Sequence, residues 1–495
     1  MKKVFKIALG IAGLYGLLMI PLPEKEWEPP KGPGTPFVWD RDALWSDLEK
    51  TFKEAKAMQP KTLDSLVNHM SQEIDSVLDE QEGMRVSLKD SSYYLKVNSM
   101  FFRIAPLIAA QKDKTDWYIG FYDRVRKKLK EDARYWPLSP EARQLSYKAL
   151  YGMRMAVEEI MLQSTDAQFE ATTRVTDEAS DTPEATILGI KVHSGDLLVS
   201  RSPAELSAFI ARGNDYPGNF SHVALIYIDE KTLEPYLVEA HIEKGVAIRS
   251  VDEYLQDKKL RFMVMRPRKD LEQLQENPML PHQAALGMYN RSKEEHIPYD
   301  FTMNYLDPSA MFCSEVGFHA YKPFGIHLWK YTSTITPNGI ENWYNDFGVE
   351  HFETTMPADL EYDTMMSVVA EWRDRQTLFE DHLDDAVMDA LIARANKGEK
   401  LGYNIWMLPV ARVLKGYSLL LNAFHKVGKV PEGMSAKKAL MERDFVARFD
   451  QLKSFTRSKA EAFEREKGYT PPYWDLVSFA ESGNGDEPGK EPYSN

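Results

Sequence analysis

Cysteine is almost absent from this sequence: its 495 residues include only one, Cys313. A single thiol cannot form an intramolecular disulfide, and it cannot supply a cysteine-rich zinc site. The histidines form no His-Glu-x-x-His or comparable metal-binding set, and the chain has no glycine-rich phosphate loop. We therefore expect no metal and no organic cofactor.

The chain also lacks an excess of positive charge. It has 61 Lys and Arg against 75 Asp and Glu, which gives a net charge of −14. A protein that binds duplex nucleic acid needs a basic face, so we expect no nucleic-acid partner. The hydrophobic fraction of 43% and the charged fraction of 27% are typical of a folded globular chain, and the length suggests roughly three domains.

The N-terminus carries the pattern of a targeting segment. In residues 1–23, three lysines (Lys2, Lys3, Lys6) precede an uncharged apolar run, Ile7–Leu22. The run is shorter than the ~20 residues of a usual membrane span, and no A-x-A-like cleavage site or lipobox cysteine follows it. An uncleaved signal-anchor is the first interpretation, a cleaved signal peptide the second, and an apolar N-terminal helix of a cytosolic protein the third. The lysines predict a body outside the cytoplasm, in a bacterial periplasm, either anchored to the inner membrane or secreted.

Hydrophobic periodicity and turn-forming residues divide the rest of the chain. The expected segments are a Pro/Gly-rich linker (24–39), a helical bundle (40–166) opened by an N-cap at Asp40, a polar linker (167–184), a C-terminal helical region (359–480) and a disordered tail (481–495). Residues 361–383 give the clearest helical pattern of the C-terminal region. Met407–Phe424 is its most apolar stretch; we interpret it as a buried helix, with a lipid-facing interfacial helix as the alternative.

The character of the chain changes between these helical parts. Five short runs there are rich in β-branched and apolar residues, and turn signals separate several of them. They are Asp196–Ser200, His222–Ile228, Tyr236–Ala240, Val246–Ser250 and Arg261–Met265. Strands clustered together and flanked by helices predict an α+β fold.

Cys313 is the first candidate for chemistry. The residues after it, with Val316 and Ala320 four apart, predict a helix that begins at or just after the cysteine. A cysteine at a helix N-terminus lies against the positive end of the helix dipole, which favours the thiolate. An inert buried cysteine is the alternative interpretation.

A thiolate nucleophile needs a histidine partner, and the imidazole needs a third group to hold it. His222 opens an apolar strand after a polar loop, where it would face a cleft. Glu239 lies in the next strand, and cross-strand adjacency can bring its carboxylate to the imidazole. His241 shares the face of Glu239 and is its rival for the orienting role.

The order of these motifs resembles a known family, the circularly permuted NlpC-type papain-like cysteine hydrolases. In that family the histidine strand precedes the nucleophile helix. The matching stretches are Gly195-Asp196-Leu197-Leu198, Ser221-His222-Val223, Val238-Glu239-Ala240, Pro298-Tyr299-Asp300-Phe301 and Phe312-Cys313-Ser314-Glu315-Val316. The resemblance covers residues 186–358 and implies a permuted papain-like sheet-and-helix domain between two helical regions.

The resemblance also implies roles for single residues. Cys313 would be the nucleophile, His222 the base and Glu239 the residue that orients the histidine. Tyr299 and Asp300 would lie near the site as candidates for substrate binding. Asp196 would be structural, at the start of the first strand. His319 departs from the family pattern, but it is six residues past the cysteine and so does not share its helical face.

The activities of the family are hydrolysis or transfer at amide and ester carbonyls. We therefore expect a cysteine hydrolase that acts on cell-wall peptide or on an acylated lipid through a thioester intermediate. An acyltransferase would use the same Cys–His pair, and an inactive papain-like domain in a helical scaffold would serve only in binding. We expect the N-terminal apolar segment to contact the membrane, and the sequence does not indicate the oligomeric state.

Overall fold

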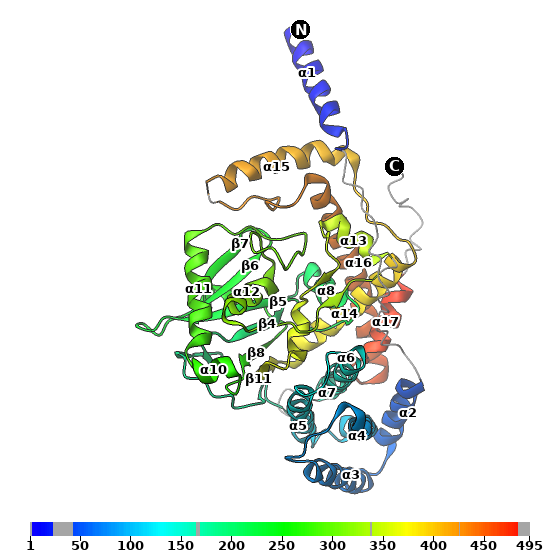
Figure 1. The fold of residues 1–495 in the computed structure, drawn as a ribbon. Coiled ribbons are helices and arrows are strands. Elements are labelled where there is room, and N and C mark those ends of the chain that lie inside the picture. Colours follow the sequence, from blue (N-terminus) through cyan, green and yellow to red (C-terminus); the bar gives the residue numbers. More distant parts are fainter. Residues whose placement is uncertain (1, 23–42, 165–168, 337–338, 425, 484–495) are drawn as a thin grey trace.

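The computed structural model describes residues 2–22, 43–164, 169–336, 339–424 and 426–483. Helices and one large antiparallel sheet make up these residues (Figure 1), in agreement with the predicted α+β class. The expected linker 24–39, the N-cap at Asp40 and residues 484–495 of the expected tail lie outside the described residues.

Helices precede the sheet in the chain. They are α1 (Lys2–Met19), α2 (Ala43–Ala57), α3 (Pro60–Glu80), η1 (Leu88–Asp90), α4 (Ser92–Gln111), α5 (Thr115–Ala133), α6 (Pro140–Tyr147), η2 (Lys148–Gly152, a π-turn) and α7 (Met153–Gln163). Apolar side chains of α2–α5 and α7 pack into one core that includes Val67, Phe101 and Tyr122. Residues 140–163 thus form three consecutive helical elements, with the π-turn between α6 and α7.

Seven strands form the central sheet in the order β1-β11-β8-β4-β5-β6-β7, and every neighbouring pair is antiparallel. Their bounds are β1 (Thr172–Arg174), β4 (Leu197–Arg201), β5 (His222–Ile228), β6 (Pro235–His241), β7 (Gly245–Ser250), β8 (Arg261–Pro267) and β11 (Met366–Arg373). Two small hairpins add β2 (Glu184–Ile187) with β3 (Ile190–His193), and β9 (Ser333–Thr334) with β10 (Glu353–Thr354).

Alternate side chains of the strands enter two different cores, as the period of two requires. On one face, Leu197, Val223 and Leu225 pack against helices α11 and α12. On the other face, Leu198 and Ala224 pack against the β2–β3 hairpin and α9. The helices around and after the sheet are α8 (Glu205–Arg212), α9 (Val251–Gln256), α10 (Glu272–Glu276), α11 (Leu280–Glu294), α12 (Cys313–Tyr321), η3 (Lys322–Phe324), α13 (Ile340–Phe347) and η4 (Pro357–Tyr362).

The prediction of a helix over residues 361–383 is wrong for the first half of this segment. Residues Met366–Arg373 form β11, which lies between β8 and β1 in the sheet. Met365, Val369 and Trp372 have helical spacing, but strand pairing prevails because β8 and β1 offer hydrogen-bonding edges on both sides. The linker expected over 167–184 likewise supplies β1 at the sheet edge.

The C-terminal helices are α14 (Arg375–Asn396), η5 (Ile405–Met407), α15 (Leu408–Asn422), α16 (Ala436–Lys467) and α17 (Tyr473–Ser482). The interpretation of Met407–Phe424 as a buried helix is wrong. Only Leu408, Pro409, Ala411 and Ser418 of α15 are buried, and the remaining apolar side chains are exposed or half-exposed. The helix lies at one end of the molecule beside α1 (Figure 1).

Buried ion pairs join the N-terminal helices, the sheet and α14. Arg261 of β8 contacts Glu158 of α7 through Nη2 and Oε2 at 3.0 Å, and Asp381 of α14 at 2.5 Å. Arg126 of α5 contacts Glu371 of β11 at 2.8 Å. All five side chains are at most 1% exposed, so these charges are compensated by one another rather than by water. The N-terminal helices, the sheet and α14, which are distant in sequence, therefore share one buried interior.

Candidate active site

Cys313 is the first residue of α12, as the sequence predicted. Phe312 before it is extended, with φ −90° and ψ 177°, and its N–H donates to Glu315 Oε2 at 3.2 Å, which fixes the start of the helix. The cysteine is 3% exposed, and its thiol lies 3.7 Å from the carbonyl oxygen of Ser221. The nucleophile candidate therefore sits at a helix N-terminus against the start of β5.

The structure brings His222 to this cysteine. His222 is the first residue of β5, directly after Ser221, and it is half-buried. Its Nε2 lies 2.5 Å from Glu239 Oε2, and the nearby Cys313 contributes to the raised pKa of its ring. Because the carboxylate occupies Nε2, the other ring nitrogen, Nδ1, is the one available to the thiol.

Glu239 lies between the two histidines of the predicted set. It is 1% exposed and comes from β6, which pairs with β5 through Leu225 and Val238. Its second oxygen, Oε1, is 3.0 Å from His241 Nε2 and 3.5 Å from Arg249 Nη1. In this structure Glu239, rather than His241, is therefore the group that contacts His222.

The charges of this cluster support one another. Burial alone would lower the pKa of His222, but hydrogen bonds to Cys313 and Glu239 raise it to about 9. Burial would raise the pKa of Glu239, but its hydrogen bonds to His222 and His241 hold that pKa well below its usual range. At neutral pH the histidine is thus an imidazolium next to a carboxylate, and it can stabilise a thiolate on its other side.

A small cavity of about 70 Å³ opens beside Cys313, and nearly all of its walls are apolar. They come from α8, from residues 299–303, from α13 and from Met434, far along the chain. Representative lining residues are Phe209, Ile210, Met303, Phe347 and Met434. Sequence reasoning missed these residues, because an apolar side chain at helical spacing carries the same signal whether it fills a core or lines a cavity.

Tyr299 and Asp300, the candidates for substrate contact, differ in their surroundings. Both line the cavity, and burial together with the nearby Cys313 raises the pKa of the Tyr299 hydroxyl well above its usual value. The Asp300 carboxylate accepts hydrogen bonds from Thr302 N, Thr302 Oγ1 and Asn304 N at 2.6–2.8 Å. Asp300 therefore holds the turn that carries Tyr299.

Three other titratable residues lie in or next to the motifs. Asp196 forms a two-pronged ion pair with Arg266, at 2.8 Å for both contacts, and so belongs to the sheet. Burial lowers the pKa of His319 to about 4, and Lys322 adds to this effect. Burial and the charge of Asp300 raise the pKa of Glu315 to about 10, so the carboxyl next to the helix start is neutral.

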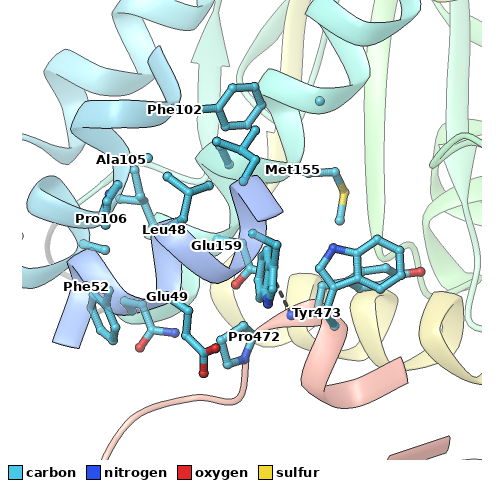
Figure 2. Close-up of a pocket in the computed structure, with 18 of the residues that line it drawn as sticks. Leu48, Glu49, Phe52, Phe102, Ala105, Pro106, Met155, Glu159, Pro472 and Tyr473 are labelled. Atoms are coloured by element: carbon cyan, nitrogen blue, oxygen red, sulfur yellow. Dashed lines mark hydrogen bonds between the residues drawn. The ribbon is translucent and has the colours of Figure 1, made fainter. Parts of the chain in front are cut away.

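A larger cavity of about 370 Å³ lies in the helical part, between α2, α4, α7 and residues 469–474. Figure 2 shows its apolar walls, with Leu48, Phe102 and Met155 around Glu159. The N–H of Tyr473 donates to Glu159 Oε1 at 2.8 Å, and burial raises the pKa of Glu159 to about 7. The sequence assigned no function to these residues. Among the residues that the structure describes, no cluster of three or more His, Cys, Asp or Glu side chains is placed to hold a metal ion.

A comparison with family models agrees with the resemblance. Residues 191–370 match the family model described as permuted papain-like amidase enzyme, YaeF/YiiX, C92 family. The match extends past residue 358, the expected end of the domain, into β11. A search of curated proteins finds no match. Among solved structures, the metalloprotein YiiX from Escherichia coli O157:H7 is 17% identical, with a TM-score of 0.28; the alignment covers 36% of this chain and 97% of that one. Residues 191–370 are thus similar to the permuted papain-like amidase family.

Proposed function

We propose that this protein is a cysteine hydrolase that cleaves an ester or amide of an apolar acyl group through a thioester on Cys313. The observation that carries the proposal is the position of the cysteine. It lies beside the start of β5, with its thiol 3.7 Å from the carbonyl oxygen of Ser221 next to His222, and it lies on the wall of an apolar cavity. A thiol–imidazole pair beside a small apolar recess suits acyl transfer to the sulfur.

In the first half of the reaction, the Cys313 thiolate attacks the carbonyl carbon of the substrate. The carbonyl π electrons move to the oxygen, and backbone N–H groups at the start of α12 would stabilise that oxyanion. The intermediate collapses, the bond to the leaving alcohol or amine breaks, and the His222 imidazolium donates its proton to the leaving group. The products are the acyl thioester and a neutral His222.

In the second half, water attacks the thioester. Neutral His222 accepts a proton from the water while the water oxygen forms a bond to the carbonyl carbon. Collapse of this intermediate releases the carboxylic acid, and the sulfur leaves as the thiolate. Glu239 keeps its charge throughout and stabilises the imidazolium that returns. The pair Cys313 and His222 is then restored to its starting state.

The cavity favours an acyl group over a cell-wall peptide. Peptidic substrates present charged and amide groups that need polar partners, whereas the described cavity walls offer few such partners beyond Tyr299. An acyl chain buries its methylene groups against the same walls, at about 0.8 kcal/mol for each CH₂. We therefore place an acylated molecule, rather than a stem peptide, as the substrate.

A series of p-nitrophenyl esters with increasing acyl length tests this proposal, measured below the concentrations at which the longer esters form micelles. We expect kcat/KM to rise with chain length up to the capacity of the cavity, and Cys313→Ala to abolish turnover. Ile210→Trp fills the cavity and should lower turnover of the long ester while it spares the acetate. Leu95→Trp, on an exposed surface of α4, is the matched control.

Products and alternative substrates distinguish the remaining activities. Free carboxylic acid identifies a hydrolase, and transfer of the acyl group to an added alcohol or amine identifies an acyltransferase with the same Cys–His pair. Cleavage of muropeptides without any activity on acyl esters would contradict the acyl assignment. Full activity of Cys313→Ala would remove the thiol from the mechanism.

A further inference from the structure

Helix α15 presents an apolar face to the outside of the molecule. Its outward side chains recur with helical spacing, and each is between 39% and 69% exposed. They are Val410, Val413, Leu414, Tyr417 and Leu420, joined by Phe424 just past the end of the helix, and we call them the outer face. A contiguous exposed patch of this kind marks a binding surface on most proteins, because water contact with so many apolar groups is unfavourable.

The polar side chains of α15 point the other way, into the protein. Arg412 Nη1 donates to the carbonyl oxygens of Leu18 and Ile20 at 2.7 and 2.8 Å. Lys415 Nζ donates to the carbonyl oxygens of Pro431 and Glu432, both at 2.6 Å. A helix with its charges turned inward and its apolar residues outward has the reverse pattern of a helix exposed to water.

The inner side of α15 is already covered by its own chain. Residues 426–431 run back along it, with the Val430 N–H donating to Ser418 Oγ at 3.1 Å. A Cβ on Gly428 would lie 2.3 Å from Ser418 Cβ, so the two segments are in close contact. The outer face is therefore the side of this hairpin that remains open to a partner.

Helix α1 continues the same apolar surface. It contacts α15, the Tyr15 hydroxyl donates to the carbonyl oxygen of Trp406, and Arg412 caps its C-terminal end. Val4, Phe5, Leu9 and Leu17 point to different sides of α1, and each is at least 65% exposed. A helix that is apolar all round matches lipid better than one protein groove, which covers a single side.

We propose that the outer face of α15, together with α1, binds the surface of a lipid bilayer. Trp406 and Tyr417 are residues that favour the membrane interface, and they are 63% and 55% exposed. Lys426 and Lys429 follow the outer face and are exposed, where they can contact lipid phosphates. A protein partner would instead be expected to meet polar groups within the patch.

This orientation has a consequence for the active site, which rests on the catalytic proposal above. The chain that leaves α15 continues to Gly433, where a Cβ would lie 2.6 Å from Phe301 Cδ2, and to Met434, which lines the cavity beside Cys313. Docking through α15 therefore brings the acyl cavity close to the bilayer. An acylated lipid could then reach Cys313 from the membrane surface.

A single-site probe tests the docking without any need for turnover. With Cys313→Ser as background, the chain has no other cysteine, so Tyr417→Cys can be labelled with the environment-sensitive fluorophore NBD. We expect its emission to shift to the blue and to brighten when vesicles of phosphatidylcholine and phosphatidylglycerol are added. Ser458→Cys, on the exposed side of α16, is the matched control and should not change.

Charge variants give the second measurement. V413E/L420E places two carboxylates on the outer face, and we expect about a tenfold loss of vesicle partition in flotation. Q451E/S458E adds the same charge to exposed positions of α16 and should bind like the wild type. Both pairs lie on exposed positions, so circular dichroism should show unchanged folding.

Three results would overturn the proposal. Vesicle binding with an unchanged probe at position 417 would mean that α1 binds alone. Absence of binding would mean that the outer face does not recognise lipid. A blue shift that grows with protein concentration in the absence of vesicles, together with dimers in sedimentation, would assign the face to a second copy of the chain. Catalytic failure leaves these binding readouts unaffected, since none of them requires turnover.

Discussion

Glu239 is the residue on which the electrostatics of the site depend. Its two carboxylate oxygens contact His222 at 2.5 Å and His241 at 3.0 Å, and it is buried. A buried carboxylate in such contacts keeps its charge and thereby favours the protonated form of the histidine. The protonation state of His222 is thus set by Glu239 on one side and by Cys313 on the other.

The pH dependence of turnover follows from this arrangement. Because the folded-state pKa of His222 is raised from 6.5 to about 9, the imidazolium persists through neutral pH and is lost as pH rises through about 9. We expect kcat/KM for an alkyl ester or amide, whose leaving group needs a proton, to fall along an alkaline limb near that pH. An alkaline limb at the ordinary histidine pKa of about 6.5 would contradict the assignment of the limb to a His222 with a raised pKa.

Glu239→Gln should move that limb. The amide keeps the shape of the side chain but removes the charge that favours the imidazolium, so we expect the alkaline limb to shift to lower pH. We also expect kcat/KM to fall by about 100-fold or more, as when a triad carboxylate is neutralised. The control is Glu234→Gln, in the exposed turn before β6. An unchanged pH profile in Glu239→Gln would mean that Glu239 acts only as packing.

The residues of this cluster could be predicted from the sequence because their order and spacing are local signals. The sequence alone indicates three candidates: a lone cysteine before a helical pattern, a histidine that opens a strand, and a glutamate in the next strand. The roles within the cluster could not be predicted as fully. Because side chains alternate along a strand, Glu239 and His241 lie on the same face. Only the three-dimensional contacts show that the carboxylate is the neighbour of His222.

At the scale of elements, the hairpin from β6 to β7 positions the loop that carries Tyr299. The N–H of Val246 donates to the carbonyl oxygen of Ile297 at 2.9 Å. Gly245 has a φ of 74°, and a Cβ there would lie 2.1 Å from that oxygen. The close approach of the two backbones is therefore possible only with glycine.

Gly245→Ala should displace the Tyr299 loop. We expect a loss of unfolding free energy of about 2 kcal/mol, from backbone strain and the steric clash together, and a lower kcat/KM. Gly189→Ala is the matched control, because Gly189 has nearly the same φ of 76° but open space around it. Urea denaturation of both variants measures the difference. Equal losses of unfolding free energy in the two variants would mean that the close contact with Ile297 adds nothing to the destabilisation.

Elements were predictable where one pattern dominates and not where two compete. The strands that include His222 and Glu239 stand out from flanking turns, and the structure contains both. Residues 361–383 fit helical spacing throughout, yet their first half is β11, since pairing with β8 and β1 is a long-range property. The exposed side of α15 was unpredictable for the same reason: apolar periodicity does not indicate which side meets solvent.

At the scale of the whole molecule, buried charges connect parts that are distant in sequence. Glu158 of α7 contacts Arg261 of β8 and His382 of α14 at 3.0 and 2.9 Å, and all three are fully buried. Loss of one member leaves the others without compensation in a water-free interior. These pairs were beyond sequence analysis, because a charged residue on a helix usually indicates a solvated face.

Glu158→Ala should therefore destabilise the whole molecule by about 3–5 kcal/mol. Glu159→Gln, at the neighbouring position, is the control. Burial raises the pKa of Glu159 to about 7, so a neutral side chain that still accepts the Tyr473 N–H should cost little. Urea unfolding of each variant measures both effects. Similar small losses of unfolding free energy in the two variants would show that the stability of the helical bundle and the sheet does not depend on this network.

Alkylation of Cys313 is the measurement that tests the central claim most directly, since no other thiol can react. We would follow iodoacetamide modification against pH in the folded wild type, in His222→Gln and in urea-unfolded protein. The account predicts rapid modification of the folded wild type at neutral pH and a marked loss of that reactivity in folded His222→Gln. A thiol that reacts at neutral pH only when the protein is unfolded, or that is indifferent to His222, would contradict the assignment of Cys313 and His222 as a catalytic pair.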